Sequence, residues 1–449
     1  MSAKISFSPP RGTRDFYPEQ MKIRNGLFSV WRGVSAAYGF TEYDSCILEH
    51  EELYVLKSGA EILDQLYGFT DKGGRRVALR PEMTPSLARM LAAKGTTLAK
   101  PLKWFSIAQC FRYERTARGR RREHYQWNLD IVGVSEVAAE AELLAAAVEV
   151  LERLGLREED IVIQVSHRRL LTAVLQGLEI PEDRGPQLLG IIDKRGKESE
   201  ETLWKLLLEL GVPEEKLRNL LDLLEEKDLE AFRVFLENKG IETRSVEEIR
   251  QLFKYLEAYG IQNYCEFCPS IVRGLPYYTG IVFECFDRER RFRAVFGGGR
   301  YDDLLELFGA GSSPAAGLGF GDVVIQEILE VKSAQPWPTR RMDFFVIPYS
   351  ETERPLSIRV VQQLRRQGFV VDLLLASRKL KVALRESTRS HPERVILLLP
   401  EELGRGALVL RDMASGEEER VPLEAFLRDP RGFLGSSTET EKGNHRESF

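Results

Sequence analysis

The segment FRYERTARGRRREHYQWNLDIVG, residues 111–133, carries the pattern that decides the fold. It holds six arginines and three acidic residues, and every second residue after the basic run is apolar. Because successive side chains of a strand point to opposite faces, this alternation predicts an antiparallel hairpin over residues 104–133 with one apolar face. That face of its second strand carries Tyr125, Trp127, Leu129 and Ile131. The opposite face groups Arg112, Glu114, Gln126, Asn128 and Asp130.

The polar face of this hairpin has two interpretations. A solvated sheet face would alternate in the same way, so the pattern leaves a surface hairpin open. A binding site is favoured, because a solvated face does not require a cation, carboxylates and amides at neighbouring positions. The loop between the strands, RTARGRRR at 115–122, is too charged to pack in a core. Its arginines are suited to a polyphosphate or a nucleic-acid backbone.

Composition sets limits on the class of protein. The chain has 449 residues, of which 43% are hydrophobic and 30% charged, which is typical of a soluble protein of two or three domains. No apolar run approaches the roughly 20 residues that span a bilayer. The first residues, MSAKISFSPPRGTRDF, contain no apolar signal core. We therefore expect a cytoplasmic protein that does not enter membranes.

Charge and cysteine content narrow the partners. A formal net charge of −5 argues against non-specific wrapping of long DNA, although it leaves room for a local basic patch. Cys265 and Cys268 form a CxxC motif, but no second pair of zinc ligands accompanies them. We therefore expect no metal ion held by protein side chains.

The hydrophobic pattern also divides the chain along its length. Leucine runs between charged rows predict a helical insertion at about 168–257. Proline and polar residues predict a linker at 331–341. Over 342–428, apolar strands alternate with helices and predict a small α/β domain. The remaining residues, 429–449, are predicted to be disordered.

Several motifs show which family the sequence resembles. FRYE, the basic loop and REHYQ resemble motif 2 of a class II aminoacyl-tRNA synthetase, in the form typical of histidyl-tRNA synthetases. PRGTRDF at 10–16, LRPEMT at 79–84, RGLPYYTGIVFE at 273–284 and FGGGRYDDL at 296–304 resemble that family in the same order. The similarity covers about residues 1–428. LRPEMT together with RGLPYYTGIVFE is specific to histidyl-tRNA synthetases and their close paralogues.

The resemblance implies a fold and a reaction. It implies an α+β catalytic domain at 1–330 built on an antiparallel sheet, with the helical insertion inside it, and an anticodon-binding domain at 342–428. It also implies a homodimer. Its partners would be L-histidine, ATP and tRNA(His), with ATP as a substrate and Mg²⁺ arriving with ATP. Histidine would be activated to histidyl-adenylate and then transferred to the 3′ end of the tRNA.

The same resemblance implies roles for individual residues. Arg112 and Arg273 are the expected catalytic residues, directed at the α-phosphate and the histidine carboxylate. Glu114 would accept a hydrogen bond from the adenine amino group, and Arg120 would hold the terminal phosphates. The expected ATP-binding residues are Arg112, Glu114, Arg120 and Arg273. The expected histidine-binding residues are Glu82, Met83, Thr84, Arg112, Gln126, Asp130, Arg273, Tyr277, Tyr278 and Tyr301.

A basic segment of the C-terminal domain is expected to contact tRNA. SRKLKVALRESTR, at 377–389, predicts a helix whose cations lie within about two turns, at roughly 1.5 Å per residue. A lone basic helix is usually a solvated face. Inside a domain that resembles an anticodon reader, tRNA binding is favoured. The expected contact residues are Arg378, Lys379, Lys381 and Arg385.

Three positions depart from the family's pattern. The family usually has proline at Cys46 in motif 1 and aspartate at Pro276. At Val324 in motif 3 it usually has an arginine that stacks near the adenine and meets the γ-phosphate. The missing arginine leaves an alternative open: a non-charging paralogue that senses histidine as a regulatory subunit of ATP phosphoribosyltransferase. That paralogue generally lacks the anticodon-binding domain, so residues 342–428 favour the synthetase.

Overall fold

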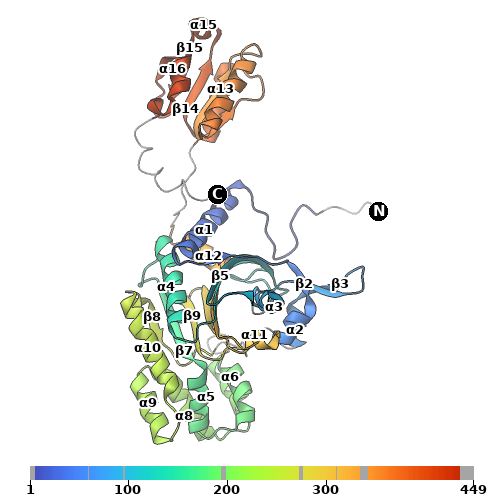
Figure 1. Ribbon diagram of the computed structural model, residues 1–449, viewed down its shortest axis with the longest axis vertical. Coiled ribbons are helices and arrows are strands. Elements are labelled where there is room, and N and C mark those ends of the chain that lie inside the picture. The colour runs from blue at the N-terminus through green and yellow to red at the C-terminus, as the bar shows by residue number, and fades with distance from the viewer. Residues whose placement is uncertain are drawn as a thin grey trace. The chain divides into compact units, whose positions relative to one another are not determined.

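The computed structural model describes residues 6–58, 60–94, 97–193, 199–272, 277–309, 311–333 and 342–434. The chain divides into two compact units, Met1–Trp337 and Pro338–Phe449 (Figure 1). The division falls inside the segment predicted as a linker, and the finer domain boundaries stay predictions. Within the described ranges, no helix is both long and apolar enough to cross a membrane.

An eight-stranded sheet is the frame of the first unit. Its order is β1-β5-β6-β11-β10-β9-β7-β8, and neighbouring strands are antiparallel except for β1 with β5 and β7 with β8. The predicted antiparallel sheet is therefore confirmed for the central strands, with a parallel pair at each edge. The strands are β1 Thr41–Glu42, β5 Leu102–Phe111, β6 Glu123–Val132, β7 Ile161–His167, β8 Cys265–Phe267, β9 Ile281–Asp287, β10 Phe296–Arg300 and β11 Ala315–Gly321. A separate three-stranded sheet, in the order β2-β4-β3, contains β2 Leu48–His50, β3 Tyr67–Thr70 and β4 Arg76–Leu79.

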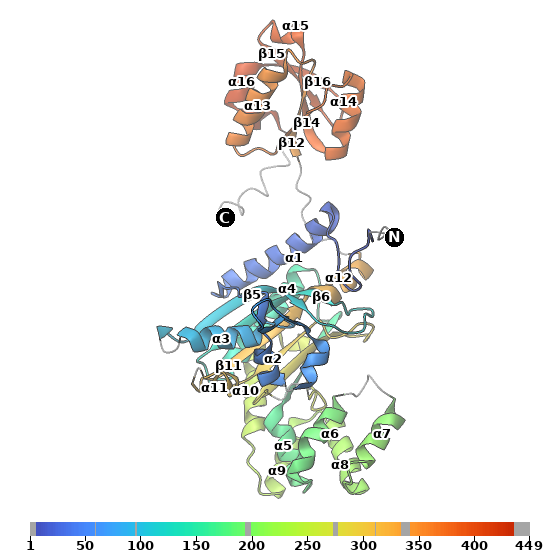
Figure 2. The ribbon, with the colours of Figure 1, turned by 90° about the vertical axis from the view of Figure 1, so that its right-hand side faces the viewer.

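The predicted hairpin is formed by β5 and β6, and its apolar face enters the main core. Trp127 and Leu129 are fully buried and Ile131 is nearly so. The Trp127 ring stacks on that of Trp31, with 6.2 Å between ring centroids, and its indole nitrogen donates a hydrogen bond to Ser35 Oγ at 2.9 Å. The helices whose residues join this core are α1 Pro18–Ala37, α4 Ala138–Arg153, α10 Arg244–Ala258 and α12 Asp322–Val331 (Figure 2). These helices pack against one face of the sheet only, and the opposite face carries the polar side chains of β6.

Shorter helices border that other face. A second cluster joins Leu87 and Leu91 with Tyr278, Tyr301 and side chains that alternate with the main-core residues of the strands. The helices on this side are α2 Glu51–Ser58, α3 Thr84–Lys94 and α11 Leu304–Leu307.

The helical insertion has a core of its own. Leu217, Phe232 and Leu236 are fully buried there, in a cluster of leucine, isoleucine and valine side chains. Its helices are α5 Arg168–Gly177, α6 Gly185–Ile192, α7 Glu200–Leu208, α8 Glu214–Glu225 and α9 Leu229–Asn238, followed by α10 (Figures 1 and 2). The region predicted to be helical is helical, because its apolar residues recur with the helical period and bury one face of each helix.

The second unit is built on a five-stranded sheet in the order β13-β12-β14-β15-β16. Phe344 and Val346 of β12 enter one core, and Phe345 and Ile347 enter another, so both faces of the sheet are covered. The strands are β12 Met342–Pro348, β13 Val371–Leu373, β14 Pro392–Leu398, β15 Ala407–Asp412 and β16 Glu418–Pro422. The helices are α13 Arg354–Arg366, α14 Leu380–Ser387, α15 Pro400–Leu403 and α16 Leu423–Arg428.

Two details of the second unit correct the sequence analysis. The basic helix α14 begins at Leu380, because Lys379 has an extended backbone with φ −62° and ψ 139°, so Arg378 and Lys379 precede it. The ordered chain also continues past residue 428. Phe433 packs on Phe426, with 5.6 Å between ring centroids, and Phe433 and Leu434 contact the core of the second unit. Residues 435–449 of the predicted tail lie outside the described residues.

Candidate active site

A cavity of about 1200 Å³ lies on the polar face of the eight-stranded sheet. Its lining comes from the β5–β6 hairpin, the turn before α3, the glycine-rich strands β10 and β11, and the helical insertion. The predicted site residues that line it are Glu82, Thr84, Arg112, Glu114, Arg120, Gln126, Asp130, Tyr277, Tyr278 and Tyr301. Residues far apart in the sequence therefore meet in one cavity, and the polar face of the hairpin is not a solvated surface.

One predicted residue that the structure describes is not part of this lining. The Met83 side chain is fully buried and packs with Ala108 and Cys110, beneath the cavity. The turn at LRPEMT sends Glu82 and Thr84 toward the cavity, so the side chain between them points the other way. A direct contact between the Met83 side chain and a ligand is therefore not supported. Arg273, like Pro276, lies outside the described residues.

The glycines of β11 make room for the polar side chains of β6. Gly317 pairs with Asp130 in the ladder. A Cβ atom on Gly317 would collide with Asp130 Oδ1 and lie 2.8 Å from the Leu129 carbonyl oxygen. A Cβ atom on Gly319 would collide with Gln126 Nε2. Side chains on β11 would therefore fill the space that the carboxylate and the amide occupy.

Asp130 is the most unusual group in the cavity. It is 2% exposed, and its Oδ1 accepts a hydrogen bond from the Tyr301 hydroxyl. Its Oδ2 has no hydrogen-bond partner among the described residues. Burial raises the pKa of Asp130 to about 7, although the hydrogen bond from Tyr301 and the charge of Lys57 lower it. Because buried polar atoms are normally paired, this oxygen marks a place where a ligand can donate a hydrogen bond.

Lys57, at the end of α2, is a cavity neighbour that the sequence analysis missed. Its side chain is fully buried, and its ammonium lies 2.5 Å from Glu82 Oε2. The same nitrogen lies 4.0 Å from the centre of the Tyr277 ring. The lysine thus places a positive charge beside Glu82, one of the predicted histidine-binding residues. No signal in the sequence separates it from an ordinary exposed lysine at a helix end.

Several cations also line the cavity. Arg112 Nε donates a hydrogen bond to the Pro81 carbonyl at 3.0 Å, which fixes the plane of the guanidinium. Arg120 forms an ion pair with Glu114. Burial lowers the pKa of Arg120, and the positive charges of Arg293 and Arg112 lower it further. Like charges converge here, which favours an anionic ligand.

His124, the only histidine of the hairpin, is not one of these cations. Burial lowers its pKa to about 3, with Arg112 and Arg14 acting in the same direction, while a hydrogen bond with Gln126 opposes the shift. The ring is therefore neutral at neutral pH. Its hydrogen bond can orient the Gln126 amide in the cavity.

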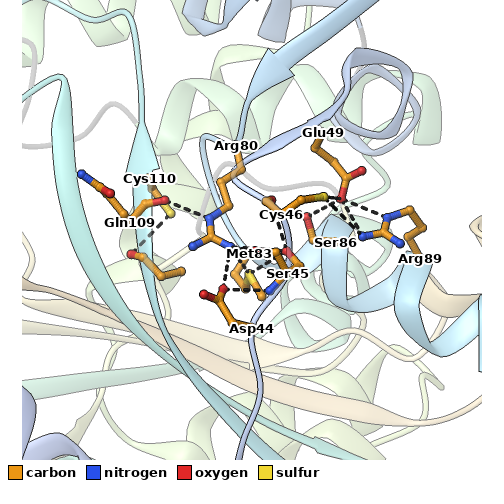
Figure 3. A network of polar contacts seen from close by, with 11 residues as sticks. Asp44, Ser45, Cys46, Glu49, Arg80, Met83, Ser86, Arg89, Gln109 and Cys110 are labelled. Atoms are coloured by element: carbon orange, nitrogen blue, oxygen red, sulfur yellow. Dashed lines mark hydrogen bonds and ion pairs between the residues drawn. The ribbon is translucent and has the colours of Figure 1, made fainter.

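A network of polar contacts surrounds the turn before α3 (Figure 3). Arg80 is 1% exposed, and its guanidinium donates hydrogen bonds to the Gln109 carbonyl at 2.9 Å and to Asp44 Oδ1 at 2.8 Å. Beside it, Glu49 Oε2 accepts hydrogen bonds from Ser86 Oγ at 3.1 Å and from Arg89 Nε at 2.9 Å. The network ties residues 44–49 to the start of α3, and so fixes the backbone that presents the cavity carboxylate.

The predicted tRNA contacts lie in the second unit. Arg378, Lys379, Lys381 and Arg385 are all exposed. Arg378 Nε lies 3.4 Å from Glu386 Oε1, a pair that is exposed and therefore weak. The positions are accessible to a large ligand, and their role stays a prediction.

Comparisons with known proteins bear on the whole chain. The family model "Histidyl-tRNA synthetase" matches residues 12–321, and the model "Anticodon binding domain" matches residues 343–428. A relative from Arabidopsis thaliana named "Histidine--tRNA ligase, chloroplastic/mitochondrial" is 43% identical over 420 residues, which cover 94% of this chain and 86% of that protein.

Solved structures share the fold. The histidyl-tRNA synthetase of Nostoc sp. PCC 7120 is similar with a TM-score of 0.79 and 23% identity, covering 96% of this chain and 100% of that one. A Bacillus halodurans structure titled an ATP phosphoribosyltransferase regulatory subunit/histidyl-tRNA synthetase is similar with a TM-score of 0.73 and 24% identity, covering 88% of this chain and 99% of that one. The family model spans most of the chain and the cavity joins the motifs it contains, so the chain belongs to the histidyl-tRNA synthetase family.

Proposed function

We propose that the protein is a histidine–tRNA ligase that activates histidine with ATP and transfers it to tRNA(His). A histidine carboxylate oxygen attacks the α-phosphorus of ATP, and the bond to the leaving pyrophosphate breaks. A ribose hydroxyl at the 3′ end of the tRNA then attacks the carbonyl carbon of histidyl-adenylate, and AMP leaves. The observation that carries the proposal is the buried oxygen of Asp130, unpaired among the described residues, in a cavity that arginines also line.

Asp130 is suited to the imidazole of histidine. The hydroxyl of Tyr301 fixes one carboxylate oxygen, so the other is oriented to accept a hydrogen bond from a ring N–H. A competing amino acid with an apolar side chain would leave that oxygen unpaired in a buried place. Such mismatches give large selectivity, because a buried polar group that loses its partner is costly. We assign Gln126, Tyr277 and Tyr278 to the same pocket, since all three line the cavity.

The amino acid's ammonium is assigned to Glu82, with Thr84 beside it. Lys57 already lies at 2.5 Å from Glu82, so the carboxylate is part of a charge cluster rather than an isolated anion. The contact with Lys57 orients the Glu82 carboxylate before the substrate arrives.

The arginines that line the cavity are assigned to the phosphates. Attack at the α-phosphorus builds negative charge, and preorganised cations stabilise it. The hydrogen bond from Nε of Arg112 to the Pro81 carbonyl holds its guanidinium in one plane, and its terminal nitrogens make no hydrogen bond to a described residue. We propose that Arg112 binds the α-phosphate, aided by Arg273. Arg120 would exchange its ion pair with Glu114 for the terminal phosphates, which frees Glu114 for the adenine amino group.

Mg²⁺ is proposed to enter with ATP. Within the described residues, no group of three or more histidine, cysteine, aspartate or glutamate side chains could hold a metal ion. Mg²⁺ commonly keeps several waters and binds substrate phosphates with one or two carboxylates. The ion's ligands in this site would therefore come mainly from the triphosphate and water.

A homodimer is also proposed. Leu48, Leu56 and Phe69 are apolar side chains of β2, α2 and β3 that are 44%, 53% and 46% exposed. They lie on the elements that follow Cys46 of motif 1, and we propose that a second copy of the chain covers them. Sedimentation velocity should give a mass near twice that of the 51.3 kDa chain, and a concentration-independent monomer would contradict the proposal.

The C-terminal unit is proposed to bind the anticodon arm of tRNA(His), since residues 343–428 match an anticodon-binding model. The same match makes the regulatory alternative less well supported. We infer that the protein aminoacylates tRNA in the cytoplasm. The organellar location in the name of the Arabidopsis relative applies to that protein.

The test of the proposal is ATP–pyrophosphate exchange with each standard amino acid in turn. Exchange is expected with histidine alone. Histidine binding without exchange would contradict the proposal and favour the histidine-sensing paralogue.

A further inference from the structure

The arginines that line the cavity differ in what they contact. Arg112 donates a hydrogen bond to a carbonyl, Arg120 pairs with a carboxylate, and the guanidinium of Arg290 lies 3.6 Å from the centre of the Phe286 ring. Arg121 and Arg293 also line the cavity, and neither has a hydrogen bond or ion pair with a described residue. Arg121 belongs to the motif 2 loop, which is already expected to contact phosphate. Arg293 lies outside that loop, and no ion pair with a described residue balances its charge.

Arg293 lies just before β10 and reaches the tip of the motif 2 loop. The tip is Gly119, whose φ of +70° is the left-handed region, and whose backbone N–H donates to Glu327 Oε1 at 3.0 Å. A Cβ atom built on Gly119 would lie 3.3 Å from Val324 Cγ2 and 3.6 Å from Arg293 Cδ. Val324 in the first turn of α12 and Arg293 in the segment before β10 therefore flank the same glycine.

This contact relates Arg293 to the departure found in motif 3. At position 324, where the family usually has an arginine, this chain has a valine that is 6% exposed. Arg293, in the segment between β9 and β10, brings a cationic side chain to the same glycine. Its charge acts on Arg120, the arginine expected to hold the terminal phosphates. Three cations thus converge beside the loop in a chain whose net charge is −5.

We propose that Arg293 is a further ATP-binding residue, which contacts the triphosphate in place of the arginine that is missing at position 324. The proposal rests on the proposed function, because it names a contact of the same substrate. Guanidinium groups bind phosphate oxygens through two parallel N–H donors, and such charge-assisted hydrogen bonds are among the stronger ones in proteins. Like-charge repulsion among the three arginines is relieved when the triphosphate binds.

The test compares Arg293→Ala with Arg291→Ala. Arg291 is a matched control: it lies in the same loop, it does not line the cavity, and its Nε lies 2.9 Å from Glu289 Oε2. Affinity for a non-hydrolysable ATP analogue is measured by calorimetry without histidine, and KM values for ATP and histidine are measured by pyrophosphate exchange. Arg293→Ala should weaken the analogue and raise the KM for ATP by about 10- to 100-fold, the loss expected for hydrogen bonds to a charged group. The KM for histidine should change less than twofold.

The Arg291→Ala variant should match the unaltered protein in every measurement. Arg293→Lys should recover part of the affinity, because it restores the charge without the planar fork. Equal analogue affinity in the Arg293→Ala and Arg291→Ala variants would overturn the proposal, as would an equal loss of histidine affinity. The calorimetric comparison does not depend on catalysis, so it can succeed or fail separately from the exchange assay that tests the function.

Discussion

Replacing Asp130 with asparagine removes one charge from the cavity and preserves its shape. The Tyr301 hydroxyl can still donate to the amide oxygen, so the neighbouring ring keeps its partner. What is lost is the ionised acceptor proposed for the imidazole. A hydrogen bond to a charged group contributes about 1.5–3 kcal/mol, so the dissociation constant for histidine should rise by about 10- to 150-fold. ATP-analogue affinity without histidine should stay unchanged.

The pH dependence of histidine binding gives a sharper form of this prediction. The pKa of Asp130 is raised from its ordinary value of 3.8 to about 7, so the carboxylate ionises near neutral pH. Calorimetry across pH 5.5–8.5 should show affinity that grows through about pH 7 in the unaltered protein and lacks this component in Asp130→Asn. Free histidine also titrates, near pH 6.5, but that change affects both proteins equally. Tyr301→Phe removes a hydrogen bond that lowers the pKa, so it should move the transition to higher pH.

The same shift predicts how stability depends on pH. Because the folded pKa lies above the unfolded one, Asp130 contributes stability that is complete below about pH 3.8 and is lost as pH rises through about 7. Between pH 5 and pH 8 the free energy of unfolding should fall by about 3 kcal/mol more in the unaltered protein than in Asp130→Asn, as followed by the urea midpoint of the first unit.

The binding measurements can refute the role given to Asp130. They would do so if Asp130→Asn bound histidine within twofold of the unaltered protein and with the same pH profile.

Three further predictions concern other parts of the molecule. Gly317→Ala should weaken histidine binding at least tenfold, because the added Cβ displaces the Asp130 carboxylate. Gly190→Ala is the control, because a Cβ there meets nothing within 4 Å; equal histidine affinities of the two variants by calorimetry would contradict the account. Val324→Arg should weaken the ATP analogue, because the new charge enters a buried place beside Arg293; tighter binding would show that the site had only lost a useful group. A chain ending at Val331 should keep histidine-dependent exchange and lose most tRNA charging, and equal charging by both chains would remove the role given to the second unit.

Alternation predicted the hairpin and its two faces, because a strand has a strict period of two. The same rule placed Gln126 and Asp130 on the ligand side and Trp127 in the core. The rule does not apply to Met83, which lies in the turn between β4 and α3; its side chain packs with Ala108 and Cys110, and its place in the site stays a prediction. The alternation was therefore sufficient to predict which side chains of the hairpin share a face.

Lys57 and Arg293 could not be predicted in this way. Lys57 reaches Glu82 through the packing of α2 beside the turn before α3, and Arg293 reaches Gly119 through the order of strands in the sheet. Both contacts join segments that no period or motif links. The start of α14 was misplaced for a related reason, because the basic residues at 378 and 379 are compatible with either a helix or an extended segment.

The most direct measurement of the central claim is the transfer of radiolabelled histidine to a tRNA(His) transcript by the purified full chain with ATP and Mg²⁺. The account predicts acid-precipitable label that depends on ATP, is released by mild base as expected for an ester, and falls at least tenfold with Asp130→Asn at subsaturating histidine. A chain that binds histidine and ATP but leaves the transcript unlabelled would contradict it.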